Sequence, residues 1–159
     1  NSEVKKAINS LKNGKAAGSD QAFTEMVVAA QQEIVPFLVI YFNELFSSGM
    51  YPEEWTKAII LPLFKKGDKE DPNNYRGISL LSVLSKVYTH IISARLSFWA
   101  EDNDVITEAQ AGFRRGRSTI DHIFTLFAAV QKHLSQKVKL YIAFIDFKKA
   151  YDTVNRTLL

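Results

Sequence analysis

The sequence predicts an α+β fold in which amphipathic helices surround one β-hairpin and one further strand. Apolar residues recur at helical spacing over three long segments, 23–48, 82–99 and 118–134. Two short β-like segments, 57–64 and 75–81, flank a run of turn residues, which is the pattern of a hairpin. A third apolar and aromatic run at 141–145, which leads into Asp146, is short enough to indicate a buried strand.

Composition places the chain among folded proteins of ordinary type. It has 159 residues, of which 47% are hydrophobic and 23% charged, with a net charge of +3. The absence of cysteine excludes disulfides, thiolate zinc sites and a cysteine nucleophile. No apolar run is long enough to span a membrane and no signal peptide is visible, so we expect an intracellular protein of the nucleus or cytoplasm that is not secreted. Both ends resemble cuts within a longer polypeptide.

The first two helical segments carry specific expectations about their ends. Ser2 is predicted to cap a first helix over the opening residues, with Gly14 ending it. In segment 23–48, Pro36 predicts either two helices or a kink, and Gly49 closes the segment. The aromatic residues of this segment are expected in the core; they are Phe37, Tyr41, Phe42 and Phe46.

A basic loop at 12–20 and the hairpin at 57–80 are the first candidate binding elements. Two glycines make the loop flexible, and Lys15 could face a nucleic acid, although a solvated turn is the favoured interpretation from the residues alone. In the hairpin, Lys65 ends one strand and Arg76 lies on the other, so the two cations could converge on a triphosphate. Lysines that merely keep the hairpin tip soluble are an equally favoured alternative.

An arginine-rich segment at 110–119 precedes the last helix. Its glycines permit close backbone approach, and Arg114, Arg115 and Arg117 suit the phosphates of a nucleic acid. Phe113 either stacks on a base or, as the favoured alternative, anchors the loop in a core. Ser118 with Asp121 three residues later predicts a capping box at the start of the helix.

The apolar run 141–145 leads directly into Asp146. Two lysines at positions 148 and 149 follow, and then Tyr151 and Asp152. A carboxylate on a rigid strand end suits a divalent metal and phosphate chemistry. A simple cap of the following turn is the favoured interpretation on spacing alone. The three histidines have no metal-like spacing and are expected to be structural or solvated.

Four segments, in order along the chain, resemble one family: reverse transcriptases of non-LTR (LINE-type) retrotransposons. Residues 12–20 are similar to its K-N-x-K-A-x-G-x-D segment, and 60–67 with 74–80 resemble motifs 1 and 2, with Gly77 where many relatives have proline. Residues 110–119 resemble the Q-x-G-F-R-x-G-R-S-T segment, and 144–152 resemble motif A, F-x-D-x-x-K-A-F-D. The residues of these motifs are most similar to those of RTE-like elements.

The resemblance implies a right-hand polymerase fold and a role for each candidate residue. It makes 1–140 the helix-rich fingers, with the hairpin at about 57–80, and 141–159 the start of the palm, in one incomplete domain. Asp146 and the carbonyl of Phe147 would be metal ligands, and Asp152 would hold the turn. Lys65, Arg76 and Tyr151 would contact the incoming dNTP, and the residues facing nucleic acid would be Lys15, Arg114, Arg115 and Arg117.

The implied reaction is RNA-templated DNA synthesis with two Mg²⁺ ions about 3.5–4 Å apart. The implied partners are an RNA template, a DNA primer, dNTP and the remaining palm and thumb; an attached endonuclease stays open, and no membrane is involved. Motif B and the paired aspartates of motif C are missing, so we expect this fragment to be inactive alone. The alternatives are a non-catalytic RNA-binding remnant or domesticated module, and a purely structural helical domain.

Overall fold

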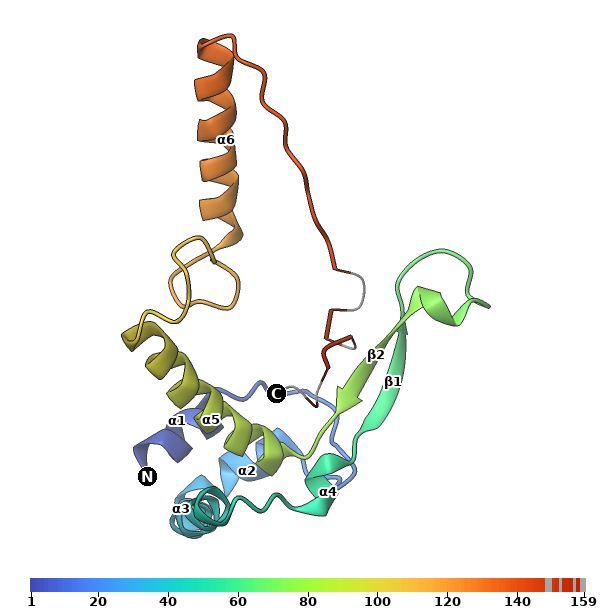
Figure 1. The fold of residues 1–159 in the computed structure, drawn as a ribbon. Helices are drawn as coiled ribbons and strands as arrows, with labels where there is room; N and C mark the ends of the chain where they lie inside the picture. The colour runs from blue at the N-terminus through green and yellow to red at the C-terminus, as the bar shows by residue number, and fades with distance from the viewer. Residues whose placement is uncertain (148–149, 152, 156, 158–159) are drawn as a thin grey trace. The chain divides into compact units, whose positions relative to one another are not determined.

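The structure is a computed structural model that describes residues 1–147, 150–151, 153–155 and 157. The chain forms two compact units, residues 1–105 and 106–159. The first unit contains five α-helices, one short 3-10 helix and a two-stranded antiparallel sheet: α1 (Ser2–Asn9), α2 (Thr24–Ala29), α3 (Gln31–Ser48), α4 (Glu53–Thr56), β1 (Ile59–Phe64), η1 (Pro72–Asn74), β2 (Tyr75–Leu80) and α5 (Val83–Asp102). The second contains α6 (Thr119–Ser135) (Figure 1). The α+β prediction is confirmed at this level.

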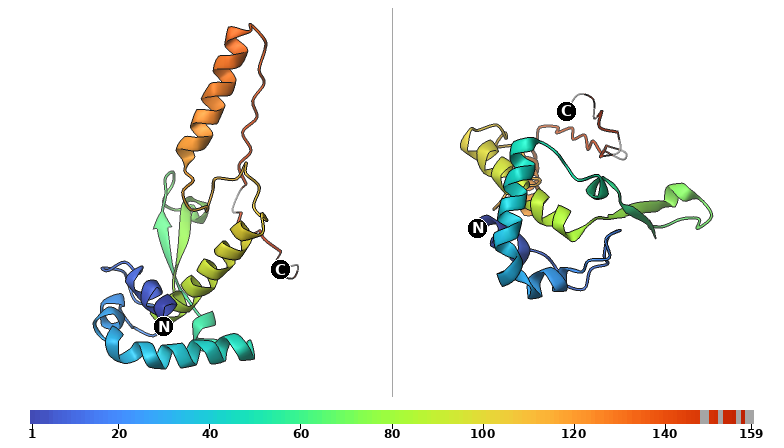
Figure 2. Two further views of the ribbon diagram at one scale, coloured as in Figure 1. Left: turned by 90° about the vertical axis from the view of Figure 1, so that its left-hand side faces the viewer. Right: turned by 90° about the horizontal axis from the view of Figure 1, so that it is seen from below.

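One hydrophobic core holds the helices of the first unit together. α1 packs against α3 and α5, and Ile8 and Val87 are fully buried between them. Trp55 of α4 closes one side of this core, where its ring lies edge-on to Phe42 of α3 and tilted against Tyr88 of α5. The hairpin leaves this helical cluster and extends away from it, as two views show (Figures 1 and 2).

Three expectations about helix ends need correction. Asn1, not Ser2, is the N-cap of α1, and neither side chain accepts a capping hydrogen bond, because Ser2 is already the first helical residue. α1 ends at Asn9, well before Gly14. Segment 23–48 does form two helices, but the break lies at Ala30 and Pro36 is inside α3. Pro36 is the sixth residue of α3, and its missing N–H removes one backbone hydrogen bond from the second turn of the helix.

The predicted core aromatics of α3 are only partly buried. Phe42 belongs to the core, but Phe37, Tyr41 and Phe46 are exposed. The buried stripe of α3 consists of Val35, Leu38, Phe42 and Leu45, and Phe37 lies outside that spacing. Phe46 lies near the end of the helix, where the Arg95 guanidinium covers its ring at 5.4 Å. Gly49 ends α3 with a left-handed φ of 68°, as expected.

The second unit places α6 after the arginine-rich loop. Ser118 and Asp121 form the predicted capping box, in which the Asp121 carboxylate accepts from the Ser118 N–H at 2.6 Å. α6 has no buried residue, so its apolar side chains are not packed into a core. After α6 the chain reverses direction and takes an extended course (Figure 1). None of the described helices is long and apolar enough to cross a membrane.

Candidate functional site

The hairpin brings Lys65 and Arg76 to one face. Leu63 pairs with Arg76, and the Lys65 N–H continues the ladder by donating to the Asn74 carbonyl at 2.8 Å. Side chains alternate across a strand, so Lys65 is on the same face as Leu63 and therefore as Arg76. The two cations are diagonal neighbours, a position in which Cα atoms lie about 7–8 Å apart. Both side chains are exposed and face solvent beside Leu61 and Ile78.

The tip of the hairpin is an ordered loop. The Asn74 amide donates to the Asp68 carbonyl at 2.8 Å, and the Tyr75 hydroxyl donates to the Lys69 carbonyl at 2.9 Å. Tyr75 also faces Phe64 across the strands, with ring centroids 5.5 Å apart. These contacts fix the backbone that follows Lys65, so its position is determined by the strands and the tip together.

Pro62 occupies a position in β1 from which a backbone N–H would not bond to β2. Hydrogen-bonded and non-hydrogen-bonded pairs alternate along an antiparallel ladder. The bond from Lys65 to Asn74 makes the pair of Pro62 with Gly77 a non-hydrogen-bonded one. Gly77, opposite Pro62, has little room for a side chain, because a Cβ added there would lie 3.1 Å from Cγ2 of Ile60.

The basic loop that contains Lys15 is anchored at two points. The Gly14 N–H donates to the Glu25 carboxylate at 2.6 Å, and this bond lowers the pKa of Glu25 below its usual value. Gly18 presses its backbone against the junction of β2 and α5, where an added Cβ would be 2.5 Å from the Leu81 carbonyl carbon. Lys15 itself is exposed between these anchors. The loop is thus fixed against the base of the hairpin.

The arginine-rich loop is organised around Glu108, which sequence reasoning missed. The Glu108 carboxylate pairs with Arg117 and lies 3.6 Å from Nη2 of Arg114. Arg114 also donates to the Thr107 carbonyl at 2.9 Å, and its side chain is only 8% exposed. Arg115 is exposed and has no such partner in the part of the chain that the structure describes. Phe113 is exposed as well, which overturns its favoured assignment as a core anchor.

The expected buried strand before Asp146 is not formed. Residues 141–147 are extended and exposed, and no described residue pairs with them as a strand. A single strand cannot satisfy its backbone groups by itself, so it needs neighbours to become part of a sheet. Asp146, Phe147 and Tyr151 are exposed in this segment and the turn after it. Asp152 lies outside the described residues.

Asp146 alone does not make a magnesium site. Within residues 1–147 and the short described stretches after them, no three His, Cys, Asp or Glu side chains gather where they could hold a metal ion. Mg²⁺ requires six oxygen ligands in near-octahedral geometry. Asp146 and the Phe147 carbonyl could supply two of them, so the residues described here do not fit a complete two-metal centre.

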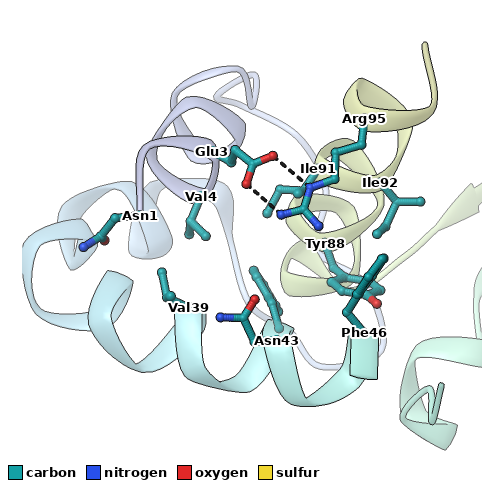
Figure 3. Close-up of a pocket in the computed structure, with 11 residues that line it drawn as sticks. Asn1, Glu3, Val4, Val39, Asn43, Phe46, Tyr88, Ile91, Ile92 and Arg95 are labelled. Atoms are coloured by element: carbon teal, nitrogen blue, oxygen red, sulfur yellow. Dashed lines mark hydrogen bonds and ion pairs between the residues drawn. The ribbon is translucent and has the colours of Figure 1, made fainter. Parts of the chain in front are cut away.

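A cavity of about 90 Å³ between α1, α3 and α5 contains none of the candidate residues. Its rim is closed by Glu3 and Arg95, whose guanidinium donates to both carboxylate oxygens at 2.9 and 2.8 Å (Figure 3). The bond from Arg95 is the main cause that lowers the pKa of Glu3. We interpret this pair as a clamp between α1 and α5 rather than as a ligand site.

The candidate residues therefore form two groups, one in each compact unit. Lys65 and Arg76 share a hairpin face in the first unit, which also holds Lys15. Arg114 and Arg117 meet at Glu108 in the second unit, which also holds Asp146. One feature of the sequence could have indicated that Glu108 pairs with the arginines: it is the single acidic residue between Asp104 and Asp121.

The chain matches a known protein family. Residues 64–159, more than half of the chain, match the family model described as reverse transcriptase (RNA-dependent DNA polymerase). The matched region begins inside the hairpin and includes both Arg76 and Asp146. It also contains the arginine-rich loop and α6.

Relatives of known name cover nearly the whole chain. The probable RNA-directed DNA polymerase from transposon BS of Drosophila melanogaster is 31% identical over 153 residues, which is 96% of this chain and 17% of the relative. The RNA-directed DNA polymerase from mobile element jockey of the same species is 29% identical over 153 residues, 96% of this chain and 17% of the relative. A Pol polyprotein from the type-1 retrotransposable element R1 of Bradysia coprophila is 31% identical over 156 residues, 96% of this chain and 15% of the relative. The chain thus spans about one sixth of their length. The finer assignment to RTE-like elements stays a prediction.

Proposed function

The chain belongs to the reverse transcriptase family of non-LTR retrotransposons, and on that premise we propose that it forms the fingers and the start of the palm of an RNA-directed DNA polymerase. In this proposal 1–140 is the fingers region, and 141–159 begins the palm. The substrates are an RNA template, a DNA primer and dNTP. The protein is proposed to act inside the cell.

The observation that carries the proposal is the shared hairpin face of Lys65 and Arg76. A triphosphate bears several negative charges, which suit a lysine point charge beside the planar fork of an arginine. The ordered tip holds both residues on a rigid element, so little conformational entropy is lost when a ligand binds. We assign these two side chains to the phosphates of the incoming dNTP and Tyr151 to its sugar.

Binding of a nucleotide to the 159-residue chain tests this assignment. A fluorescent dNTP titrated against the protein should bind more weakly after Lys65→Ala or Arg76→Ala, by about tenfold or more, because hydrogen bonds to charged groups contribute about 1.5–3 kcal/mol. Lys66→Ala is the matched control, since it removes the same charge one residue outside the shared face. Equal losses in the Lys65 and Lys66 variants would contradict the assignment, because they would show a diffuse charge effect.

Asp146 and the Phe147 carbonyl are proposed as ligands that this chain contributes to a Mg²⁺ site. Mg²⁺ would supply charge neutralisation for phosphoryl transfer. Mn²⁺ added to the chain should broaden the NMR signals of 145–147, and Asp146→Asn should remove that broadening. Broadening that survives the substitution would refute the role of Asp146.

We also propose that these residues do not polymerise by themselves, because Asp146 supplies too few ligands for two metal ions. Primer extension with the 159-residue chain, an RNA template and Mg²⁺ should give no product. Template-dependent synthesis in that assay would overturn this part of the proposal.

A further inference from the structure

The loop that precedes α6 is braced from inside by an arginine. The Arg114 guanidinium is nearly buried, donates to the Thr107 carbonyl at 2.9 Å and lies 3.6 Å from Glu108. A guanidinium that is already desolvated and paired within its own loop is not displayed to a ligand. Arg114 therefore stabilises the loop, and the ligand-facing groups must be its neighbours.

Phe113, the residue before this brace, is held outward. Its side chain is 94% exposed, the most exposed of the large hydrophobic residues that the structure describes. Its backbone has a φ of 63°, which is unfavourable for a residue other than glycine. The turn is fixed on both sides, because the Arg114 N–H donates to the Ala111 carbonyl at 3.4 Å and the Gln110 amide donates to the Gly112 carbonyl at 3.3 Å. Strained backbone of this kind is concentrated at functional sites.

The sequence neighbours of Phe113 are typical of a base-stacking site rather than of an apolar protein-docking patch. Its sequence neighbours are Gly112, the internally paired Arg114, the exposed Arg115 and Gly116. A Cβ added at Gly112 or Gly116 would meet no atom within 4 Å, and Phe113 itself is almost fully exposed, so its ring is open to a ligand. Docking surfaces for proteins are contiguous apolar patches, whereas an aromatic ring flanked by a cation is typical of single-stranded nucleic-acid sites.

We propose that Phe113 stacks on an unpaired base of a single-stranded RNA while Arg115 contacts the adjacent phosphate. The proposal rests on the proposed function, since it specifies how the arginine-rich loop would bind the template. It differs from the favoured expectations from sequence in two respects. Phe113 is a ligand-facing ring and not a core anchor, and Arg114 supports the site from within and does not contact the nucleic acid.

Fluorescence anisotropy with a labelled 12-nucleotide single-stranded RNA tests the proposal. The same backbone carrying abasic sites in place of every base is the matched ligand. Phe113→Ala should weaken binding of the base-bearing RNA by about 5- to 150-fold, the effect typical of one lost stack. It should leave the abasic ligand unaffected, and Phe113→Trp should restore binding. Arg115→Gln should weaken both ligands and reduce the slope of log K against log salt by about one.

The outcomes separate this proposal from the proposed function. If Phe113→Ala weakens both ligands equally, the ring shapes the loop and does not stack, so the proposal is overturned. If Phe113→Ala changes neither ligand while Arg115→Gln weakens both, stacking is refuted but nucleic-acid binding by the loop stands. If the unsubstituted chain binds neither RNA, both the stacking site and the proposed binding of template by this chain fail. Phe113→Gly relieves the positive φ without restoring the ring, and circular dichroism of that variant checks that the fold is retained.

Discussion

Replacing Gly18 by alanine tests whether the basic loop is fixed to the base of the hairpin. An added Cβ would lie 2.5 and 2.6 Å from the carbonyl carbon and oxygen of Leu81 and 2.7 Å from the Ser82 nitrogen, whereas ordinary contacts begin at 3.4 Å. One of the two backbones must therefore move by almost 1 Å. All three atoms belong to the main chain, so no rotamer change relieves the clash.

The magnitude follows from two opposing effects. Overpacking of this kind costs about 1–3 kcal/mol. Replacement of glycine by alanine stabilises the folded state by about 0.4–1 kcal/mol, because it reduces the conformational freedom of the unfolded chain. We expect the free energy of unfolding of the first unit to fall by about 1–2 kcal/mol, which corresponds to a decrease in Tm of about 4–16 °C for a unit of this size.

Thermal unfolding followed by tryptophan fluorescence measures the change, because Trp55 is buried in the core of the first unit. Gly112→Ala is the matched control, since its Cβ would meet nothing within 4 Å and its φ is not in the left-handed region. Equal melting temperatures for the Gly18 and Gly112 variants would refute the close approach of the loop to the β2–α5 junction.

Three further predictions concern ion pairs and a helix cap. Glu3→Gln should lower the free energy of unfolding by about 0.2–1 kcal/mol, which is the usual contribution of an exposed ion pair. Because the pKa of Glu3 is lowered in the folded state, this difference should be complete above the unfolded-state pKa and should vanish as the pH falls through the folded-state pKa. A difference in urea unfolding that does not change with pH would contradict this. Ser118→Ala should destabilise the start of α6 by about 0.5–2 kcal/mol, seen as faster amide hydrogen exchange at 119–122, and unchanged exchange would show that the capping box is not needed. Glu108→Gln should tighten binding of single-stranded RNA by about two- to fivefold, because it removes the charge that pairs with Arg117 while the bond from Arg114 to the Thr107 carbonyl still holds the loop. An unchanged or lower affinity in the anisotropy titration would contradict this.

Local sequence patterns predicted the elements whose structure depends on nearby residues. The capping box of Ser118 and Asp121, the end of α3 at Gly49 and the antiparallel hairpin all depend on interactions within a few residues. The order of the family motifs correctly identified reverse transcriptase, because four matches in sequence are more specific than any one of them.

Expectations that depend on distant partners were less successful. The strand expected at 141–145 needs neighbouring strands, and no described residue supplies one. Burial of Phe37 was inferred from helical spacing alone, but the face that α3 turns to the core is set by its packing against α1. The contact of Gly18 with Leu81 joins residues far apart in the chain, so local sequence gives no sign of it. In the arginine-rich loop, charge counting could not show that Glu108 engages two of the three arginines.

The position of Pro62 also determines how the hairpin meets other molecules. Residues in the non-hydrogen-bonded pairs of a ladder point their N–H and C=O groups away from the partner strand, toward any strand that might join the sheet. On β1 those residues are Ile60, Pro62 and Phe64, and the middle one has no N–H to donate. A strand from another copy would therefore find a gap in the centre of this edge. Exposed, apolar edges are the usual starting point of sheet-to-sheet aggregation, and a single proline protects this projecting hairpin from it on the β1 side.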